Sequence, residues 1–446
     1  FFSCLCLTPP MATQKRAVNF GAGKHGRGFM GKILSASGYH ITFVDTDTHL
    51  VDLLHELQAY ECHVIGAEKQ VVQVQNVDAY VNGSPELPEI MASCDVITTS
   101  IGLTQLPDIA RSVADCITTR AARKIQTPLH IIAAENCLRA STFLSGFVAD
   151  FLSPDARAYA RAHVAFVDCE VDQIVPSVER FDFTAKATPA DELRAVMEEF
   201  YELALDRRQV KAGLDLVGAT LCDDLQAIQE RKYFTVNTAH AVAAYLGHVK
   251  GYETILESIN DPDIEAAVKG AMQETAGVLI PRYNLDPEAH ADYIERTIAR
   301  FRNPHIKDTV KRVGRDPLRK LEPTDRLVAP ITWATEEKLP CTNLCRGLAA
   351  ALRYSDEHDQ QALRLQSMLH SSGLIGVLKE LLPPPLRSTD CEVVPMIEQF
   401  YEGMLAQKPV HMRKVATESS PLSAVGGLEY PAAEEEEQPP AYDRFA

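Results

Sequence analysis

In the N-terminal part of the chain, hydrophobic residues form short runs separated by longer stretches of helical periodicity. Such alternation is typical of a parallel β-sheet covered by helices. Beyond Asp223 the spacing of apolar residues is helical almost to residue 410. The pattern predicts an α/β fold with an N-terminal Rossmann-like dinucleotide-binding domain and a mostly α-helical C-terminal domain. The runs that we expect to be strands are Arg16–Phe20, His40–Asp45, Cys94–Ser100, Leu129–Ala134 and Ala165–Asp168.

The same pattern suggests domain limits. We expect the NAD-binding Rossmann-like domain to span residues 12–205 and a helical substrate and catalytic domain to span residues 206–412. At the end of the first domain, Asp191–Leu205 has the spacing of an amphipathic helix. Residues 1–11 lack the basic start of a secretory signal, and we expect an unstructured leader. Residues 413–446 are rich in Pro, Ser and Glu, which predicts a disordered acidic tail.

A glycine-rich turn joins the first predicted strand to the first predicted helix. Gly21, Gly23 and Gly26 have Gly-x-Gly-x-x-Gly spacing, and Asp45 ends the next strand 19 residues later. The glycines allow a tight turn, close approach of a pyrophosphate and close helix packing, and the helix N-terminus offers N–H donors. Asp45 can accept hydrogen bonds from ribose hydroxyls and would repel a 2′-phosphate, so we predict NAD rather than NADP. The alternative is a glycine-rich turn without a ligand. The predicted cofactor contacts are Gly21, Ala22, Gly23, His25, Gly26, Arg27, Asp45, Thr99 and Gly102.

A helix predicted from Asp223 to Gly247 carries three polar side chains on one side. Lys232, Asn237 and His240 fall within an arc of roughly 140° at about 100° per residue. Oxidation of an alcohol by hydride loss also requires removal of the hydroxyl proton, which a lysine can take. Asparagine can donate a hydrogen bond to the developing alkoxide, and histidine can orient a hydroxyl. The competing interpretation is a solvated polar face.

Asn136 is a further candidate for the same chemistry. It follows the strand predicted at residues 129–134, and ligands of open parallel sheets bind at the carboxyl ends of strands. A second asparagine there would donate to the same substrate oxygen as Asn237. From position alone, Asn136 could equally be a helix cap.

A basic block spans residues 300–326 in an otherwise acidic chain. Nine Lys and Arg residues face four acids there, whereas the whole chain has a formal net charge of −17. Arginine forks pair well with phosphate, so an anion site is one interpretation and a solvated charged face is the other. The overall acidity argues against a nucleic-acid or anionic-membrane surface.

The cysteines do not indicate a disulfide framework. Eleven cysteines are scattered along the chain, and Cys341 and Cys345 have a spacing that suits a helix as well as a metal. No second Cys/His pair accompanies them, so we predict reduced thiols in a cytoplasmic protein and no metal site.

Several motifs together resemble the polyol-specific long-chain dehydrogenase/reductase family. The resemblance runs from about Ala17 to about residue 405. It is carried by Phe20–Phe29, Ile131–Asn136, Phe166–Asp168 with Val171–Asp172, the Lys232-x4-Asn237-x2-His240 spacing, and Arg300–Pro304 through Arg312–Leu321. Gln173 departs from the Arg that we expect after Val-Asp in this family, which weakens the inference for that substrate-side loop.

The resemblance implies a metal-free, NAD-dependent oxidoreductase that interconverts D-mannitol 1-phosphate and D-fructose 6-phosphate. It implies that Lys232 is the general acid/base, that Asn136 and Asn237 polarise the oxygen, and that His240 contacts the substrate. The residues implied or proposed to hold substrate and phosphate are Asp172, Arg312, Arg315, Arg319 and Lys320.

Two other functions stay open. One is an NAD-dependent dehydrogenase of an unphosphorylated polyol or sugar acid; the other is a non-catalytic NAD-responsive binding protein. The expected partner is a small phosphorylated sugar or polyol, with no nucleic acid and no membrane. Pro439–Tyr442 in the tail has the shape of a proline-rich recognition peptide, which leaves a protein partner open.

Overall fold

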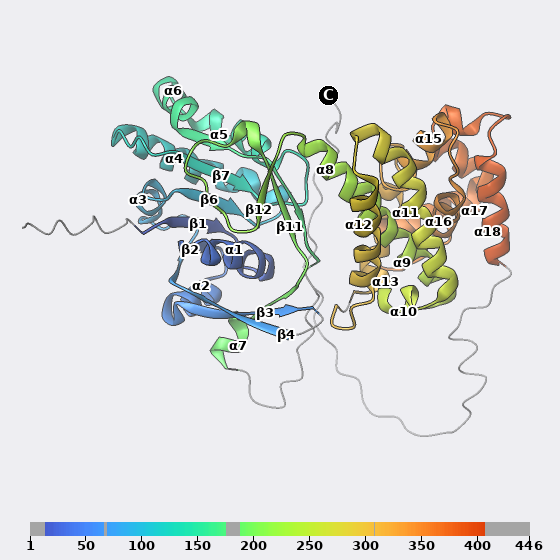
Figure 1. Cartoon of the computed structure of the whole chain (residues 1–446), viewed down its shortest axis with the longest axis horizontal. Helices are drawn as coiled ribbons and strands as arrows, with labels where there is room; N and C mark the ends of the chain where they lie inside the picture. The colour runs from blue at the N-terminus through green and yellow to red at the C-terminus, as the bar shows by residue number, and fades with distance from the viewer. Residues whose placement is uncertain (1–13, 67–68, 175–187, 307, 406–446) are drawn as a thin grey trace, which may run out of the picture. The chain divides into compact units, whose positions relative to one another are not determined.

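The computed structural model describes residues 14–66, 69–174, 188–306 and 308–405. These residues form two compact units, the first ending at Leu225 and the second starting at Gln226 (Figure 1). The first unit thus runs beyond the boundary predicted at residue 205. The predicted leader (residues 1–11) and tail (413–446) lie outside the described residues.

A six-stranded parallel sheet forms the centre of the first unit; the hydrophobic pattern predicts five of its strands, whereas β5 was not predicted. Its order is β5-β2-β1-β6-β7-β8, and all five neighbouring pairs are parallel. The chain proceeds from β1 to one side of the sheet and later returns to β6 on the other side, which makes the β1/β6 edge a topological switch point. The strands are β1 Arg16–Phe20, β2 His40–Asp45, β5 Val77–Val81, β6 Val96–Thr99, β7 Leu129–Ala133 and β8 Val164–Phe166.

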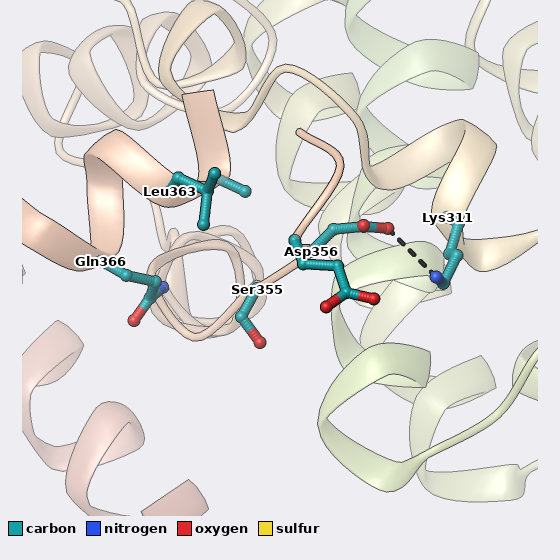
Figure 2. A pocket seen from close by; sticks show the side chains of 7 residues that line it. Lys311, Ser355, Asp356, Leu363 and Gln366 are labelled. Carbon is teal, nitrogen blue, oxygen red and sulfur yellow. Dashed lines mark ion pairs between the residues drawn. The ribbon is translucent and has the colours of Figure 1, made fainter. Parts of the chain in front are cut away.

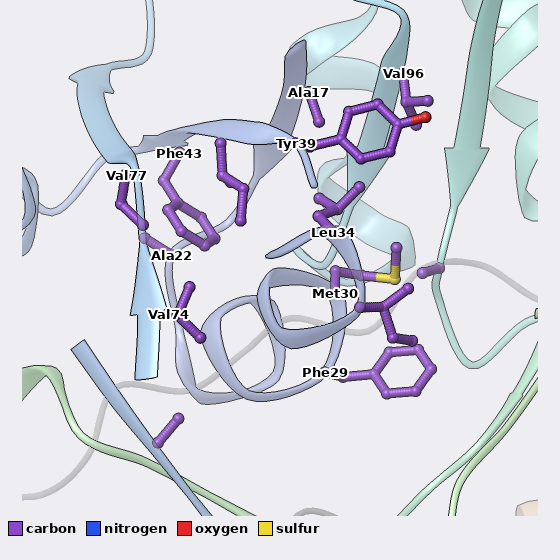
Figure 3. Packing of buried hydrophobic residues seen from close by; sticks show 14 of the residues in the cluster. Ala17, Ala22, Phe29, Met30, Leu34, Tyr39, Phe43, Val74, Val77 and Val96 are labelled. Carbon is purple, nitrogen blue, oxygen red and sulfur yellow. The ribbon is translucent and has the colours of Figure 1, made fainter. Parts of the chain in front are cut away.

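Side chains alternate between two hydrophobic cores along these strands. In β1, Ala17 belongs to one core while Val18 and Phe20 belong to the other. Figure 3 shows the first core, where Phe29 and Met30 lie close to residues of the sheet. Both faces of the sheet are therefore buried, as expected for a doubly wound parallel sheet. The helices of this unit are η1 Gly26–Gly31, α1 Lys32–Ala36, α2 Thr48–Leu57, α3 Leu87–Ala92, η2 Leu103–Gln105, α4 Leu106–Ala122, α5 Ala140–Phe151, α6 Pro154–His163, α7 Pro189–Leu193 and η3 Arg207–Gln209.

The helix predicted at Asp191–Leu205 is wrong. Only α7 is helical there, and the chain continues as two strands, β10 and β11. Strand β10 pairs with β3 in one small sheet, and β11 pairs with β9 and β12 in another. Pairing to distant strands overrides the local helix propensity of Ala, Met and Glu in this segment. The strands of these sheets are β3 Ala59–Ile65, β4 Lys69–Gln75, β9 Cys169–Asp172, β10 Ala195–Glu198, β11 Glu202–Asp206 and β12 Ala219–Cys222.

The second unit is helical in its described residues, as predicted. Helix α9 packs against α11, α13 and α16, and α16 also packs against α18. No helix in the described part of the chain is long and apolar enough to cross a membrane. The elements are α8 Leu225–Lys232, η4 Tyr233–Asn237, α9 Thr238–Lys250, α10 Ile255–Ile259, α11 Pro262–Tyr283, α12 Pro287–Phe301, α13 Val310–Gly314, α14 Pro317–Lys320, α15 Ala329–Glu336, α16 Thr342–Leu352, α17 Gln360–Leu381, η5 Pro384–Arg387 and α18 Val393–Leu405.

The helix predicted from Asp223 to Gly247 exists with different limits. It begins at Leu225, contains the π turn η4, and ends only at Lys250, where Gly251 takes a left-handed φ of 80°. Gly247 is not the stop that its position suggested. A Cβ at Gly247 would overlap the Ser258 side chain, so this glycine allows α10 to pack closely on α9.

Candidate functional site

The glycines of the turn in the first unit differ in their surroundings: Gly21 and Gly26 are required by the fold, whereas Gly23 faces open space. Gly21 has a φ of +91°, and a Cβ at Gly26 would overlap the Gly21 carbonyl oxygen. Both positions are closed to larger residues by the protein itself. A Cβ at Gly23 would meet nothing within 4 Å. Open space at the second glycine is what a pyrophosphate approaching the backbone requires, so the turn fits a dinucleotide.

The carboxylate of Asp45 is hydrogen-bonded to the backbone of this turn. Its carboxylate accepts hydrogen bonds from the backbone N–H of Ala22 at 2.5 Å and of Thr46 at 2.7 Å. Oδ1 also accepts from the Asp47 N–H at 3.1 Å, so with two lone pairs on each oxygen one further hydrogen bond, from a hydroxyl, can be accepted on Oδ2. Its contact with the ribose stays a prediction.

Arg27 and His25 lie in the same turn. The Arg27 side chain is buried and donates to the carbonyl oxygens of Ala22, Leu193 and Glu192. Burial lowers the pKa of Arg27 below its ordinary value. Its donors tie the glycine turn to the segment at α7, and its predicted cofactor contact remains untested. The His25 ring stacks on Phe29 with centroids 5.2 Å apart.

Glu135, which sequence reasoning missed as a site residue, organises the carboxyl ends of β6 and β7. Its buried carboxylate accepts hydrogen bonds from the Thr99 hydroxyl, the Ile101 N–H at 3.0 Å and the Gly102 N–H at 2.9 Å. Two predicted cofactor contacts, Thr99 and Gly102, are thus held by one carboxylate. The available signal was that an acid directly follows a buried strand.

Asn136 follows Glu135 and is exposed. Helix α5 begins only at Ala140, with Arg139 in the cap position. Asn136 is therefore not the N-cap residue of α5, and its role at the site stays a prediction. Asp172, at the end of β9, is buried in the first unit and pairs in register with Glu202 of β11.

In the second unit, a π turn lies between Lys232 and Asn237. Lys232 is the last residue of α8, and η4 comprises Tyr233–Asn237. A π turn closes over five residues instead of four, so residues i and i+5 lie nearly one above the other. Lys232 and Asn237, five residues apart, are therefore on the same side of the helix. In an uninterrupted α-helix they would be roughly 140° apart.

His240 is held by a buried carboxylate that sequence reasoning also missed. His240 Nε2 lies 3.1 Å from Asp308 Oδ2, and the ring stacks on Phe301 with centroids 4.7 Å apart. Arg312 binds the same carboxylate through Nε and a terminal nitrogen. Asp308 was visible in the sequence only as one of four acids in the basic block.

The pKa values of this trio follow from burial and mutual contact. Burial lowers the pKa of His240 and outweighs the upward effect of Asp308, so the imidazole is neutral near pH 7. Burial alone would raise the pKa of Asp308, but hydrogen bonds from His240 and Arg312 keep it well below its ordinary range. The hydrogen bond with Asp308 raises the pKa of Arg312, whose guanidinium is partly desolvated.

Acidic side chains neutralise part of the remaining positive charge of residues 300–326. Arg326 donates to Asp325 at 2.9 Å and to the Tyr233 hydroxyl at 3.2 Å, and Arg319 lies 3.7 Å from Asp325. Arg315 is exposed, and its carbonyl oxygen accepts a hydrogen bond from the Lys320 ammonium. A plain solvated face is therefore not what the structure contains, because Lys320 and Arg326 are mostly buried.

Lys320 shows how concentrated the positive charge is at this point. Its side chain is 3% exposed, and its ammonium lies 5.9 Å from the centre of the Tyr245 ring. Burial, together with the guanidinium groups of Arg326 and Arg319, lowers the pKa of Lys320 to about 7. Near neutral pH the charge of this lysine therefore responds to any anion placed beside it.

Lys311 faces a different part of the helical unit. Lys311 lines an open cavity of about 400 Å³ and lies 3.5 Å from Asp356 in an ion pair. Figure 2 shows these side chains. None of the predicted catalytic residues lines this cavity. Cys341 and Cys345 have sulfur atoms 3.8 Å apart, and the described residues contain no group of three or more His, Cys, Asp or Glu side chains that could hold a metal.

Each of the two units matches a model of a known protein family. Residues 15–217 match the model of the mannitol dehydrogenase Rossmann domain, and residues 224–373 match that of the mannitol dehydrogenase C-terminal domain.

Two solved structures share the fold. Pseudomonas fluorescens mannitol 2-dehydrogenase, in a ternary complex with NAD and D-mannitol, is 18% identical, with a TM-score of 0.66 over 92% of this chain and 95% of that one. A D-sorbitol dehydrogenase in substrate-free form is 17% identical, with a TM-score of 0.71 over 87% of this chain and 93% of that one. The two family matches together cover well over half of the sequence. The chain therefore belongs to the mannitol dehydrogenase family, a family of NAD-dependent polyol dehydrogenases.

Proposed function

We propose that this protein interconverts D-mannitol 1-phosphate and D-fructose 6-phosphate with NAD as the hydride carrier. In the oxidation direction, a hydride leaves the carbinol carbon for the nicotinamide and the hydroxyl proton goes to Lys232, which acts as general base. In the reverse direction the Lys232 ammonium returns that proton. Asn136 and Asn237 donate hydrogen bonds to the oxygen as negative charge develops on it.

The glycine turn and Asp45 support the choice of cofactor. The turn leaves room for a pyrophosphate at Gly23, and the carboxylate of Asp45 disfavours the 2′-phosphate of NADP. When bound, NAD supplies the hydride acceptor. The residues of this chain supply binding, orientation and proton transfer.

One observation carries the phosphate assignment: the crowding of positive charge around Lys320. Burial and two arginines lower the pKa of the Lys320 ammonium to about 7. A phosphate bound beside it would stabilise its protonated form. Phosphate oxygens can also accept hydrogen bonds from arginine forks such as those of Arg315 and Arg319. The proposed phosphate contacts are Arg312, Arg315, Arg319 and Lys320, with Asp172 toward the sugar hydroxyls.

A second candidate, an NAD-dependent dehydrogenase of an unphosphorylated polyol, has its own support. Asp308 already binds Arg312, and Asp325 compensates Arg326, so part of the positive charge has an internal partner. The two solved structures named above are a mannitol and a sorbitol dehydrogenase. A sugar acid stays a weaker variant of this candidate.

The test compares phosphorylated with unphosphorylated substrates. NADH oxidation is followed with fructose 6-phosphate and with fructose, using wild type, Arg319→Ala and Lys311→Ala. Arg319→Ala should raise the KM for fructose 6-phosphate at least about tenfold more than that for fructose, because one charge-assisted contact contributes about 1.5–3 kcal/mol. The exposed Lys311 serves as control and should change neither. Equal effects of Arg319→Ala on both substrates would exclude the phosphate assignment.

The catalytic role is tested separately. Lys232→Ala should abolish proton transfer and lower kcat by at least about 100-fold. Undiminished turnover in Lys232→Ala would reject the mechanism. Absence of turnover in wild type with every polyol phosphate and polyol, despite NAD binding, would favour the NAD-responsive binding protein.

A further inference from the structure

Asp308 is the buried group closest to the proposed machinery that has no role in the reaction outlined above. Its side chain is 5% exposed, and both of its oxygens are in use. Its backbone is also fixed, because its carbonyl oxygen accepts from the Ile255 N–H at 2.9 Å and Thr309 forms a β-bridge with Thr254. The carboxylate therefore sits on a rigid support, and the groups that bind it are oriented by it.

The contact with His240 determines which ring nitrogen carries the proton. An ionised carboxylate only accepts hydrogen bonds, so the nitrogen facing it, Nε2, must donate. In a neutral imidazole the other nitrogen, Nδ1, is then an acceptor. Stacking on Phe301 at an interplanar angle of 22° fixes the plane of the ring. The ring is thus specified in both tautomer and orientation.

We propose that Asp308 is a positioning residue that holds His240 in its Nε2-protonated form, so that Nδ1 accepts a hydrogen bond from a substrate hydroxyl. This inference rests on the proposed function, in which His240 contacts substrate. It assigns His240 to a hydroxyl and not to the carbonyl oxygen, because a neutral Nδ1 acceptor repels a carbonyl. The carbonyl oxygen is left to Lys232 and the two asparagines, which can donate.

Arg312 is the other partner of Asp308. Nε and one terminal nitrogen of Arg312 donate to the carboxylate, which compensates the charge of Asp308 on one side while His240 stays neutral on the other. Arg300, on α12, is a further charged group that acts on the His240 ring. Arg312 and Arg300 disfavour a proton on the ring, whereas the carboxylate of Asp308 favours one.

The first test reads the tautomer directly and needs no turnover. Nitrogen chemical shifts of ¹⁵N-histidine-labelled protein near pH 7, with the His240→Gln variant used to identify the His240 signals, should show a protonated Nε2 and an unprotonated Nδ1. The opposite tautomer in wild type would overturn the proposal. Because this measurement does not depend on activity, it stands even if the proposed reaction fails.

The second test asks whether Asp308 acts through His240. Asp308→Asn should lower kcat/KM for the polyol substrate by on the order of 10-fold to 100-fold, as expected for loss of a charge-assisted hydrogen bond. In the His240→Gln background the same change should cost less than about threefold, because coupled residues are non-additive. If the two substitutions lowered kcat/KM by independent factors that multiply in the Asp308→Asn/His240→Gln variant, the proposal would be overturned.

The pH profile separates positioning from a merely structural role. The acid limb of kcat/KM that disappears in His240→Gln should move to lower pH in Asp308→Asn, because the group that favours a proton on the ring is lost. Asp356→Asn removes a similarly shielded carboxylate from Lys311 and should leave the limb unchanged. If Asp308→Asn folds poorly by its fluorescence, Asp308→Asn combined with Arg312→Met removes both charges together. An unmoved acid limb in folded Asp308→Asn would overturn the proposal; in the double variant, whose two lost charges act on the ring in opposite directions, an unchanged preference for the Nε2-protonated tautomer would overturn it.

Discussion

Lys320 makes a quantitative prediction about how a phosphorylated substrate binds. Because its pKa is about 7 in the free protein, roughly half of the molecules carry a proton on Lys320 at pH 7 and about one tenth at pH 8. A charge about 4 Å away in a medium of effective dielectric constant about 20 contributes about 4 kcal/mol, or about three pKa units. A bound phosphate should therefore restore the proton fully.

Binding of fructose 6-phosphate should thus take up about half a proton at pH 7 and about 0.9 at pH 8. By linkage, its Kd should rise about fivefold between pH 7 and 8, because protonation of Lys320 then costs part of the binding free energy. The phosphate group, with a second pKa of about 6, is already a dianion in this range and adds little. The sign is definite: affinity falls as pH rises.

Calorimetry in buffers with different ionisation enthalpies measures the proton count. Fructose 6-phosphate is titrated into protein saturated with oxidised NAD, so that no turnover occurs. Fructose should bind without proton uptake, and Lys320→Met should bind fructose 6-phosphate without it, while Lys311→Met keeps the wild-type value. Proton uptake below about 0.2 at pH 8 in wild type, or equal uptake with fructose, would refute the reasoning.

Three further predictions concern the cofactor turn and stability. Gly23→Ala should weaken NAD binding with less than about 1 kcal/mol change in the free energy of unfolding, whereas Gly26→Ala should cost about 1–3 kcal/mol by overpacking; calorimetry and urea titration separate the two. Asp45→Ser should lower the preference for NADH over NADPH in kcat/KM by about tenfold, or about 1.4 kcal/mol. His290 is buried with neither ring nitrogen hydrogen-bonded among the described residues, and burial lowers its pKa to about 4. The unfolded chain then binds more protons, so His290 should destabilise the fold by about 2 kcal/mol at pH 5 relative to pH 8. His290→Gln should remove that difference in urea unfolding followed by Trp333, the single tryptophan; an unchanged pH dependence would contradict it.

Local patterns predicted the parts of this protein that depend on neighbouring residues. Five of the six strands of the parallel sheet, the glycine turn and the three polar residues of the helix that contains η4 are visible in short windows, whereas β5 was not predicted. The error at Asp191–Leu205 arose because β10 and β11 pair with strands far away in the chain, and their own residues are compatible with a helix.

The same limit applies to the candidate site. Glu135 bonds to residues 33 to 36 positions away, and Asp308, in the segment before α13, binds a histidine on α9. Such partners are set by tertiary packing, and no spacing rule in the sequence identifies them. The side chains to which we assign the proposed chemistry could therefore be named from the sequence, and their roles stay predictions, whereas the carboxylates of Glu135 and Asp308 could not be named.

The π turn η4 explains why the sequence spacing alone overestimates the angle between Lys232 and Asn237 around the helix axis. Counted on an ideal α-helix, Lys232 and Asn237 diverge by roughly 140°, which is a poor arrangement for two groups acting on one oxygen. Turn η4 brings them to one side, and His240, three residues further on, follows within about 60°.

The first unit has a π turn too, at Gly26–Gly31, directly after the glycine turn. Each widened turn weakens regular helical hydrogen bonding, so it is retained only where surrounding contacts stabilise it. At η1 the close packing of Gly28 and Gly31 on Met197 and Tyr60 provides those contacts. At η4 the aromatic contact of Phe234 with Trp333, 4.5 Å between centroids, provides them. The proposed alignment of Lys232 with Asn237 is therefore a property of the packing beneath the helix as much as of the two residues themselves.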